Sequence, residues 1–546
     1  MVIRFYFRAI QQLPKAWFRC LVFIFVIVAT HSASAQSLGS FRFDTVKIPD
    51  WPAIHSFAYA VMPPHVLMIG GRKDGIHDKK TGFEITSNNS SMYLWNTQTN
   101  QIIEQNLDGL PIELFDFLSA SNAEFVQDSS YLYLMGGYAQ SVLGEFKTYP
   151  VFARIDLKNI ISSILTKQDI SNSIKYRVDD TFAIAGGQLR ILDSIFYLVG
   201  GHYFSGKYND DASKTVQRYT DAYRMFTIRN TTDTFYINTL AEIRNDFNFH
   251  RRDFNLNPII DGQGNKKLMV FSGVFQYNIN RPFLNTALID RTTYEERFDF
   301  DHKLASYTCS RIGLYDSINN EFHQVFFGGM AEYYRDSLNQ IVLDPLVPFV
   351  KSVSCLTRKQ NGHFEESLLK EELPGYFGTN SEILLSPDLP LFFQDIVDLN
   401  KLPNDSVFIG TLFGGIYNPT NERNPWEKDQ AKHTISNPYL IKINYIPASP
   451  NHIGNFYTPK KDFSFQVNSN SATEKIKIYF KTKTAIKKAS IWIQDAHGRS
   501  CYFKNLTSIE NQQIELDFKN QMPATYFIRI LANDSLLYGN SFQVYQ

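Results

Sequence analysis

The chain has 546 residues, too many for one ordinary hydrophobic core, so we expect a repeat architecture or more than one domain. Aromatic residues make up 15% of it, with 45 Phe and 30 Tyr, and they favour pleated β-structure over helices. The 54 basic residues balance the 54 acidic ones without a dense basic cluster, which argues against nucleic acid or an anionic membrane surface as a partner.

The first 35 residues have the composition of an export signal. Four basic residues precede an unbroken apolar run at 21–29, and the small residues 33–35 offer a cleavage site before Gln36. Nine to twelve apolar residues are too few to cross a hydrocarbon core of about 30 Å, which disfavours an uncleaved anchor. We therefore predict a signal peptide at 1–35, an exported mature protein and no membrane span.

A short apolar run that stops at a glycine pair recurs along the chain. The second glycine of each run stands at position 71, 137, 201, 273, 329 and 415, and Ser272 replaces the first glycine of the fourth pair. A recurrence at comparable spacing indicates a repeated supersecondary unit. We therefore predict six repeats.

Each repeat contains further strand-like segments. An aromatic or β-branched run follows most of the pairs after a polar loop, and a shorter run precedes them, as at 56–61 and 123–127. The later runs lie at 91–100, 151–159, 222–230, 285–294 and 438–445. Turn-forming residues separate these runs, so each repeat is predicted to be a four-stranded antiparallel meander.

These features resemble the kelch-type β-propeller family, whose units carry an apolar strand that ends in Gly-Gly and a later aromatic-rich strand. The resemblance covers about 41–446, and it implies that the meanders stack face to face around an axis and bury their aromatic residues there. We expect an all-β fold with a six-bladed kelch-like propeller at 36–446. Glycine suits the end of the second strand because it has no Cβ and tolerates a positive φ.

The two ends of the repeat region are expected to meet. Residues 41–49 read as a strand that precedes the first repeat, while the sixth repeat reaches 438–445 without an obvious fourth strand. Pairing these two segments would complete the last blade and remove an open sheet edge. The alternative is an N-terminal strand that only packs on the outside.

Past residue 446 the composition changes. Residues 447–462 read as a linker, and short alternating strands at 463–546 predict a small β-sandwich. Its segments 491–502 and 522–530 resemble the C-terminal sorting domain of cargo of the type IX secretion system of Bacteroidetes. This resemblance implies recognition by that secretion machinery, passage across the outer membrane and a final place outside the cell or on its surface. The alternative is an Ig-like adhesion module.

The sequence offers no cofactor or metal site. Nucleotide-binding, hydrolase and zinc-protease motifs do not occur in a suitable setting. The three cysteines beyond the signal, Cys309, Cys355 and Cys501, have no zinc-binding spacing, and a single bridge between the first two is conceivable. We predict neither a metal nor a cofactor.

Candidate ligand-binding residues lie near the inner strands, whose ends open onto the axial channel of a propeller. His250, Arg251 and Asp253 form one cluster with the side-chain types that hold an anionic or sugar ligand. His55 and Asp395 also fall on or near inner strands. The competing interpretation is that such residues pair between blades and satisfy buried carbonyls.

Aromatic residues follow the glycine pairs, and propeller geometry would gather them on one rim. Stacked aromatic rings there suit sugar rings or a protein partner, or else seal the loops against one another. The main candidates are Tyr203 and Tyr277, and the remaining ones are Tyr138, Phe204, Tyr208, Phe275, Tyr333 and Tyr417.

Two classes of function remain. The first is a non-catalytic, exported binding propeller with a glycan or protein ligand, which requires only the features described above. The second is a carbohydrate-active enzyme such as a sugar mutarotase, since kelch-type propellers host enzymes as well. A copper oxidase is disfavoured because the repeats hold only two cysteines. We expect the binding protein.

Overall fold

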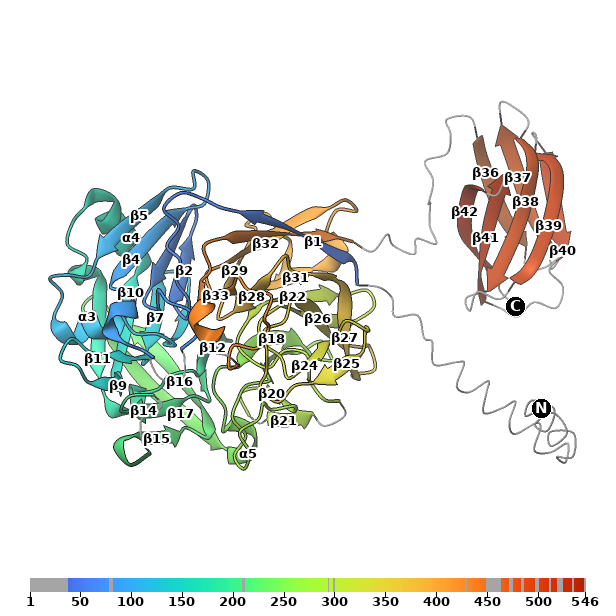
Figure 1. Ribbon diagram of the computed structural model, residues 1–546. Helices are drawn as coiled ribbons and strands as arrows, with labels where there is room; N and C mark the ends of the chain where they lie inside the picture. The colour runs from blue at the N-terminus through green and yellow to red at the C-terminus, as the bar shows by residue number, and fades with distance from the viewer. Residues whose placement is uncertain are drawn as a thin grey trace, which may run out of the picture. The chain divides into compact units, whose positions relative to one another are not determined.

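The computed structural model in Figure 1 describes residues 38–544 apart from short gaps. The gaps are 78–81, 209–211, 293, 298–299, 428–429, 448–462, 471–474, 483–485, 496–499, 510–511, 518–523 and 533–534. Residues 40–446 form one compact unit, and the strands after residue 462 belong to a second unit. The predicted signal peptide and all but Pro447 of the predicted linker lie outside the described residues.

The unit 40–446 consists mainly of small antiparallel sheets, so the all-β prediction is confirmed. The unit contains six sets of four paired strands, of which five are sheets of their own and the fifth along the chain belongs to a six-stranded sheet. Within each set the strands follow one another in the order of the chain, apart from the first strand of the unit. Their strands are β2 (Ala58–Met62), β3 (His65–Ile69), β4 (Ser91–Asn96) and β5 (Ile102–Asn106); β6 (Glu124–Gln127), β7 (Tyr131–Met135), β10 (Val151–Asp156) and β11 (Ile174–Val178); β12 (Gln188–Leu192), β13 (Ile195–Val199), β16 (Ala222–Asn230) and β17 (Phe235–Arg244); β18 (Asn255–Ile260), β19 (Lys266–Phe271), β20 (Thr286–Ile289) and β21 (Tyr294–Arg297); β22 (Ser310–Asp316), β23 (Glu321–Phe327), β26 (Ser352–Arg358) and β27 (Phe364–Glu372); β29 (Glu382–Leu385), β32 (Val407–Phe413), β35 (Leu440–Ile446) and β1 (Ser40–Val46).

The N-terminal strand β1 lies in the same sheet as the last strands of the unit. It pairs antiparallel with β35 from Ser40 opposite Ile446 to Val46 opposite Leu440. Figure 1 shows this blue strand beside the orange strands of the last sheet. Phe41 is buried and packs edge-on against Phe327 of the preceding sheet, with ring centroids 5.4 Å apart. The chain ends of the unit are thereby joined by seven residue pairs.

The second strand of each sheet ends at the glycine pair that the sequence repeats. Both residues of every pair have a positive φ, including Ser272 at 55° in the one pair without a first glycine. A Cβ added at Gly136 would lie 1.9 Å from the carbonyl oxygen of Ile184 in the next sheet. Close approach between sheets, together with the left-handed backbone, therefore explains the recurrence of glycine.

Six residues, one before the inner strand of each sheet, form a closed ring of backbone hydrogen bonds. Each N–H donates to the carbonyl oxygen of the corresponding residue in the preceding sheet, with N···O distances of 2.7 to 3.5 Å. The members of this backbone ring are Ser56, Asn122, Gly186, Asp253, Thr308 and Asn380. Five of the six have a positive φ, a conformation that Gly, Asn and Asp adopt more readily than other residues.

A second set of hydrogen bonds links the same sheets. The N–H of the second glycine of each pair donates to a carbonyl of the next sheet, at 2.8 to 3.1 Å, and Gly415 of the last sheet donates to Ile54 of the first. The donors are Gly71, Gly137, Gly201, Gly273, Gly329 and Gly415. Both sets of bonds return to the sheet where they start, and the strands β2, β6, β12, β18, β22 and β29 each begin just after a member of the backbone ring.

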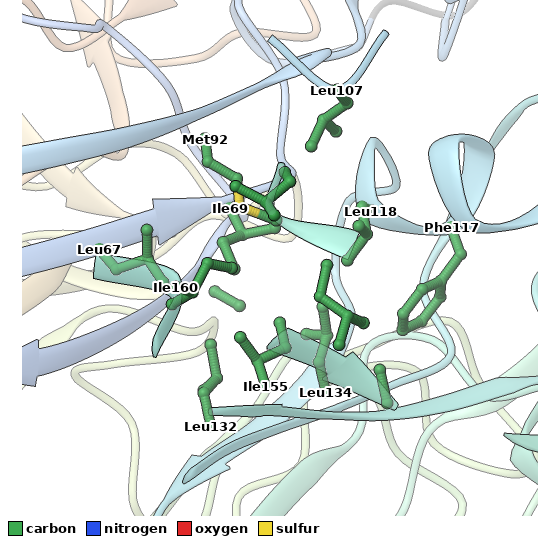
Figure 2. Close-up of a cluster of buried hydrophobic side chains, with 14 of the residues drawn as sticks. Leu67, Ile69, Met92, Leu107, Phe117, Leu118, Leu132, Leu134, Ile155 and Ile160 are labelled. Atoms are coloured by element: carbon green, nitrogen blue, oxygen red, sulfur yellow. The ribbon is translucent and has the colours of Figure 1, made fainter. Parts of the chain in front are cut away.

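The hydrophobic core lies between neighbouring sheets. Figure 2 shows one such cluster, in which Leu67 and Ile69 of β3 face Leu132 and Leu134 of β7. Helix α4 (Leu157–Thr166) closes this cluster with Ile160 and related side chains on its apolar face. Burial of apolar surface between sheets is worth about 25 cal/mol per Å², and a single meander could not provide it alone.

Insertions in the loops carry the remaining elements. The predicted strand 151–159 ends at Asp156, whose side chain accepts a hydrogen bond from the N–H of Asn159 and caps α4. The other helices are α3 (Ile112–Leu118) and α5 (Asp246–Phe249), with 3-10 turns at Ile85–Ser87, Ser171–Ser173, Asp180–Phe182, Ala212–Lys214, Leu399–Lys401 and Gln430–His433. The additional strands are β8 (Tyr138–Gln140), β9 (Phe146–Thr148), β14 (His202–Ser205), β15 (Val216–Tyr219), β24 (Tyr333–Arg335), β25 (Ile341–Leu343), β28 (Tyr376–Thr379), β30 (Leu391–Phe393), β31 (Ile396–Asp398), β33 (Ile416–Asn418) and β34 (Ile435–Ser436).

The C-terminal unit contains two antiparallel sheets. One holds β36 (Phe463–Asn470), β37 (Lys475–Thr482) and β40 (Gln512–Asp517), and the other holds β39 (Ser500–Ile509), β38 (Ile486–Asp495), β41 (Ala524–Ala532) and β42 (Ser535–Val544). The predicted turn around Gly498 and Arg499 lies outside the described residues. Throughout the part of the chain that the structure describes, no helix has the length and apolarity needed to span a membrane.

Candidate functional site

A cavity of about 660 Å³ adjoins the backbone ring. Ser56, Asn122, Asp253 and Asn380 of the ring line it, together with loop residues that follow the glycine pairs. Its volume falls within the range of about 300–1,000 Å³ that is typical of small-molecule sites. We call it the Arg72 cavity, after the most deeply buried arginine in its wall.

Arg72 directly follows the first glycine pair and is only 2% exposed. Its Nε donates to Asp74 Oδ1 at 2.9 Å, and its guanidinium group lies 4.6 Å from the centroid of the Phe83 ring. Its Nη1 is buried and has no hydrogen-bond partner among the described residues. A buried guanidinium N–H without a partner is costly, and the hydrogen bonds that the same guanidinium donates to Asp74 offset that cost.

His55 and Asp74 complete the polar wall around this arginine. His55 Nδ1 lies 2.9 Å from the Ser56 hydroxyl, and its Nε2 lies 3.5 Å from Asp74 Oδ1. Burial lowers the pKa of His55 below its ordinary value, so the imidazole is neutral at pH 7. Burial alone would raise the pKa of Asp74, but His55 and Arg72 outweigh it and lower the value to about 2. Asp74 is therefore a permanent carboxylate behind the cavity wall.

A second arginine, Arg252, lines the cavity. Its Nη1 donates to Asp253 Oδ2 at 3.1 Å and its Nη2 to the Tyr208 hydroxyl at 2.6 Å, while its buried Nε has no partner in the described chain. The Phe275 ring lies 5.0 Å from this guanidinium group. Burial raises the pKa of Asp253, and the charge of Arg252 acts in the opposite direction. The carboxyl and the guanidinium therefore hold each other in place.

The cavity also has apolar and aromatic walls. Tyr307 and Trp426 line it along with Phe83, Tyr208 and Phe275, and Arg281 at its edge donates through Nε to the buried Glu332 at 2.5 Å. Aromatic faces next to guanidinium donors suit an oxygen-rich ring compound, because ring C–H groups stack on the aromatics while hydroxyl or carboxylate oxygens accept hydrogen bonds. The cavity thus combines aromatic faces with guanidinium groups.

The structure brings together some of the predicted site residues and separates others. His55 and Asp253 line the Arg72 cavity. Arg251 does not: its exposure is 0%, and its guanidinium donates to Asn248 O at 2.6 Å and Ser272 O at 2.5 Å inside its own sheet. The assignment of Arg251 to a ligand is thus replaced by a structural role, because neighbouring residues of a chain point to different sides.

The other candidates lie outside this cavity. His250 pairs with Asp221, at 2.6 Å, and Tyr277, which is 59% exposed, meets it edge-on in an outer cluster. Tyr203 stacks under the guanidinium of Arg218 at 4.5 Å. Asp395 lines a different cavity, described below.

The expected aromatic rim is present only in part. Tyr208 and Phe275 line the cavity, whereas Tyr138 and Phe204 pack beneath it in a cluster with Phe83. Tyr417 stacks on Phe377 instead, with ring centroids 4.5 Å apart. Some of these aromatics therefore face a ligand space, and others seal the loops.

Sequence reasoning missed Arg72, Phe83, Tyr307 and Trp426. A usable signal existed for Arg72, because the residue directly after the glycine pair faces the ring in several sheets. Arg72, Val274, Met330 and Ile416 all occupy that position and line the cavity. The other three residues come from loops without a repeated pattern.

No cysteine is among the residues that line the Arg72 cavity. Cys309 and Cys355 are free thiols and both are buried, so the conceivable bridge between them is not formed. The described residues contain no group of three His, Cys, Asp or Glu side chains arranged to hold a metal ion.

Comparisons with known proteins add little. No family model matches the chain, and no curated protein does. Solved structures do match, among them the structure of YjhT, at 11% sequence identity and a TM-score of 0.41 over 72% of this chain and 96% of that one. At this identity and TM-score we base no argument on the similarity.

Proposed function

We propose that residues 40–446 form a six-bladed β-propeller of the kelch type. The support lies in the closed backbone ring of six residues, the second set of hydrogen bonds from the glycine pairs, and the pairing of β1 with β35. Each of the six sets of four strands would be one blade, and the inner strands would surround the axis.

On this fold we propose a binding protein for a carbohydrate ring, held in the Arg72 cavity. One observation carries the proposal: two guanidinium groups, those of Arg72 and Arg252, line one cavity together with several aromatic rings. A sugar fits both kinds of side chain, since its oxygens accept hydrogen bonds from arginine and its ring face stacks on Phe275 or Trp426.

A glycan array followed by calorimetry on the recombinant protein tests this proposal. Binding of at least one sugar is expected, with affinity reduced at least tenfold in Arg72→Gln and less in Arg72→Lys, which keeps the charge but loses the planar fork. Arg244→Gln is the matched control, because that side chain is 61% exposed and lies outside the cavity. Absence of sugar binding, or unchanged affinity in a folded Arg72→Gln protein, contradicts the proposal.

His55 supports a second candidate, a sugar mutarotase on the same site. The neutral imidazole lies with its Nδ1 2.9 Å from the Ser56 hydroxyl, and this hydroxyl lines the cavity and would pass a proton from an anomeric hydroxyl to Nδ1. Exchange between anomers, followed by NMR, should then be faster with the protein than without it and should slow in His55→Gln while sugar affinity persists. Binding without acceleration leaves the non-catalytic function.

We also propose that the chain is exported and that the unit after residue 462 serves as a type IX sorting domain. The support is the composition of residues 1–35 and the strands β38 and β41, which carry the segments with that resemblance. Mass spectrometry of the protein from its native cells should find a mature N-terminus at Gln36 and loss of the C-terminal unit. An intact chain in the cytoplasm would contradict the proposal.

A further inference from the structure

A second cavity, of about 310 Å³, lies further along the inner strands from the backbone ring. Side chains of β2, β12, β18, β22 and β29 line it, so it lies between the inner strands of the proposed propeller. We call it the Arg311 cavity. It shares none of its lining residues with the Arg72 cavity.

A segment at residues 386–398, between β29 and β32, covers this cavity. Its strand β31 pairs in parallel with β22 at Gly313–Tyr315, and Gln394 donates to the carbonyl of Ile191 in a different sheet at 2.8 Å. Leu391 of this segment lines the cavity and is 46% exposed, so the cavity meets solvent there. This inserted segment lengthens the chain between the fifth and sixth glycine pairs, which are the furthest apart in the sequence. It also forms one wall of the Arg311 cavity.

Two arginines line the Arg311 cavity with unused donors. Arg190 donates through Nε to Leu256 O at 3.0 Å, and Arg311 donates through Nε to Asn257 Oδ1 at 2.5 Å and through Nη1 to Cys309 O at 3.1 Å. Within the described chain, both terminal nitrogens of Arg190 and the Nη2 of Arg311 have no hydrogen-bond partner. The protein thus fixes both guanidinium groups and leaves N–H groups toward the cavity.

Two carboxyl groups line the same cavity without pairing with these arginines. Glu382 and Asp395 form no ion pair with Arg190 or Arg311, and Asp395 Oδ1 is fully buried without a partner among the described residues. Burial raises the pKa of Glu382, while the positive charges of Arg311 and Arg190 act to lower it. The carboxyl of Glu382 therefore interacts electrostatically with both arginines without a direct contact. Opposite charges held apart around a cavity leave room for a bridging molecule.

We propose that the Arg311 cavity binds a small zwitterion, a free α-amino acid. Its carboxylate accepts hydrogen bonds from Arg190 and Arg311, and its ammonium group donates to Asp395. Its side chain lies against the apolar wall formed by Ile383 and Leu391. A simple anion fits less well, because it would leave the buried Asp395 oxygen without a donor and add a like charge beside it.

Thermal-shift screening and calorimetry of the full chain with the twenty standard amino acids test this inference. At least one should bind, and its N-acetylated and methyl-ester derivatives, which each lack one charge, should bind at least tenfold more weakly. Asp395→Asn and Arg190→Gln should each weaken binding at least tenfold. Asp388→Asn is the matched control, because Asp388 lies in the same segment, is exposed and does not line the cavity.

Three results would overturn the inference: no amino acid binds, binding survives in folded Asp395→Asn and Arg190→Gln proteins, or acetate binds as well as the amino acid. Melting temperatures identify a variant that fails to fold, and Arg190→Lys then serves as the milder replacement. Sugar binding in the Arg72 cavity is measured separately, so failure of one proposal is distinguishable from failure of the other.

Discussion

The carboxyl of Glu124 should make the protein less stable as the pH rises. This residue is 1% exposed at the start of β6, where its Oε1 accepts the N–H of Gly187 from the next sheet at 2.7 Å. Its Oε2 is buried and has no hydrogen-bond partner among the described residues. Burial raises the pKa of Glu124 from 4.5 to about 8, although the hydrogen bond from Gly187 acts against this rise.

Because the pKa of Glu124 is raised in the folded protein, its ionisation destabilises the fold. Below pH 4.5 the carboxyl is protonated in both the folded and the unfolded chain and contributes nothing to the pH dependence. Between pH 4.5 and about 8 the unfolded chain loses the proton while the folded one keeps it, so stability falls as the pH rises. The rise in pKa from 4.5 to about 8, at about 1.4 kcal/mol for each pH unit, corresponds to a penalty of about 5 kcal/mol above pH 8.

Glu124→Gln removes the titration and keeps an oxygen for the Gly187 N–H. The variant should melt close to the wild type at pH 5 and several degrees above it at pH 8.5, because only the wild type then carries the buried charge. Thermal unfolding followed by circular dichroism from pH 5 to 9 measures the difference. Glu372→Gln, at an exposed position on β27, is the control and should show no such increase.

The reasoning is refuted if the difference in melting temperature between Glu124→Gln and the wild type stays constant over this pH range. It is also refuted if the wild type gains stability relative to the variant as the pH rises. Either result would mean that Glu124 ionises in the folded protein as easily as in the unfolded chain.

One substitution and one deletion test the proposed circular arrangement of the sheets. Gly136→Ala should destabilise the protein by at least about 2 kcal/mol in chemical unfolding, because φ is 68° there and the new Cβ would lie 1.9 Å from Ile184 O. Gly109→Ala, with φ of 91° and nothing within 4 Å, isolates the backbone effect and should cost clearly less; equal losses would contradict the close contact. Deletion of residues 40–46 should lower the melting temperature and promote aggregation, measured by light scattering, because it removes seven residue pairs and exposes the edge of β35. An unchanged melting temperature would mean that β1 adds nothing to the last sheet.

The binding residues were less accessible to sequence reasoning than the strands. Arg251 and Arg252 are neighbours in the sequence, yet the first donates to carbonyls inside its sheet and the second lines the Arg72 cavity. No local pattern distinguishes them, because the direction of each side chain depends on the irregular backbone before β18, where Asp253 has a φ of 54°. His55 was identified, but its partner Asp74 was not, since the contact forms only when Arg72 folds back beside it.

Local sequence features determined the repeated strands. Glycine pairs end the second strand of each sheet because the backbone there has a positive φ at both residues. The same conformation is required in every repeat, so the glycine pair recurs along the sequence. Alternating apolar and aromatic runs fix the strands themselves. The pairing of residues 41–49 with 438–445 was also predictable, because one repeat lacked a strand and one strand lacked a repeat.

Only the tertiary structure decided where chemistry is possible. The backbone ring joins residues as distant in sequence as Ser56 and Asn380, and the two cavities draw their charged groups from several sheets. The ring positions recur in every repeat, but the sequence of a single repeat does not show which side chains of other repeats they meet, because those contacts depend on how neighbouring sheets pack. The segment 386–398 likewise pairs with β22 of another repeat, and it lines a second cavity.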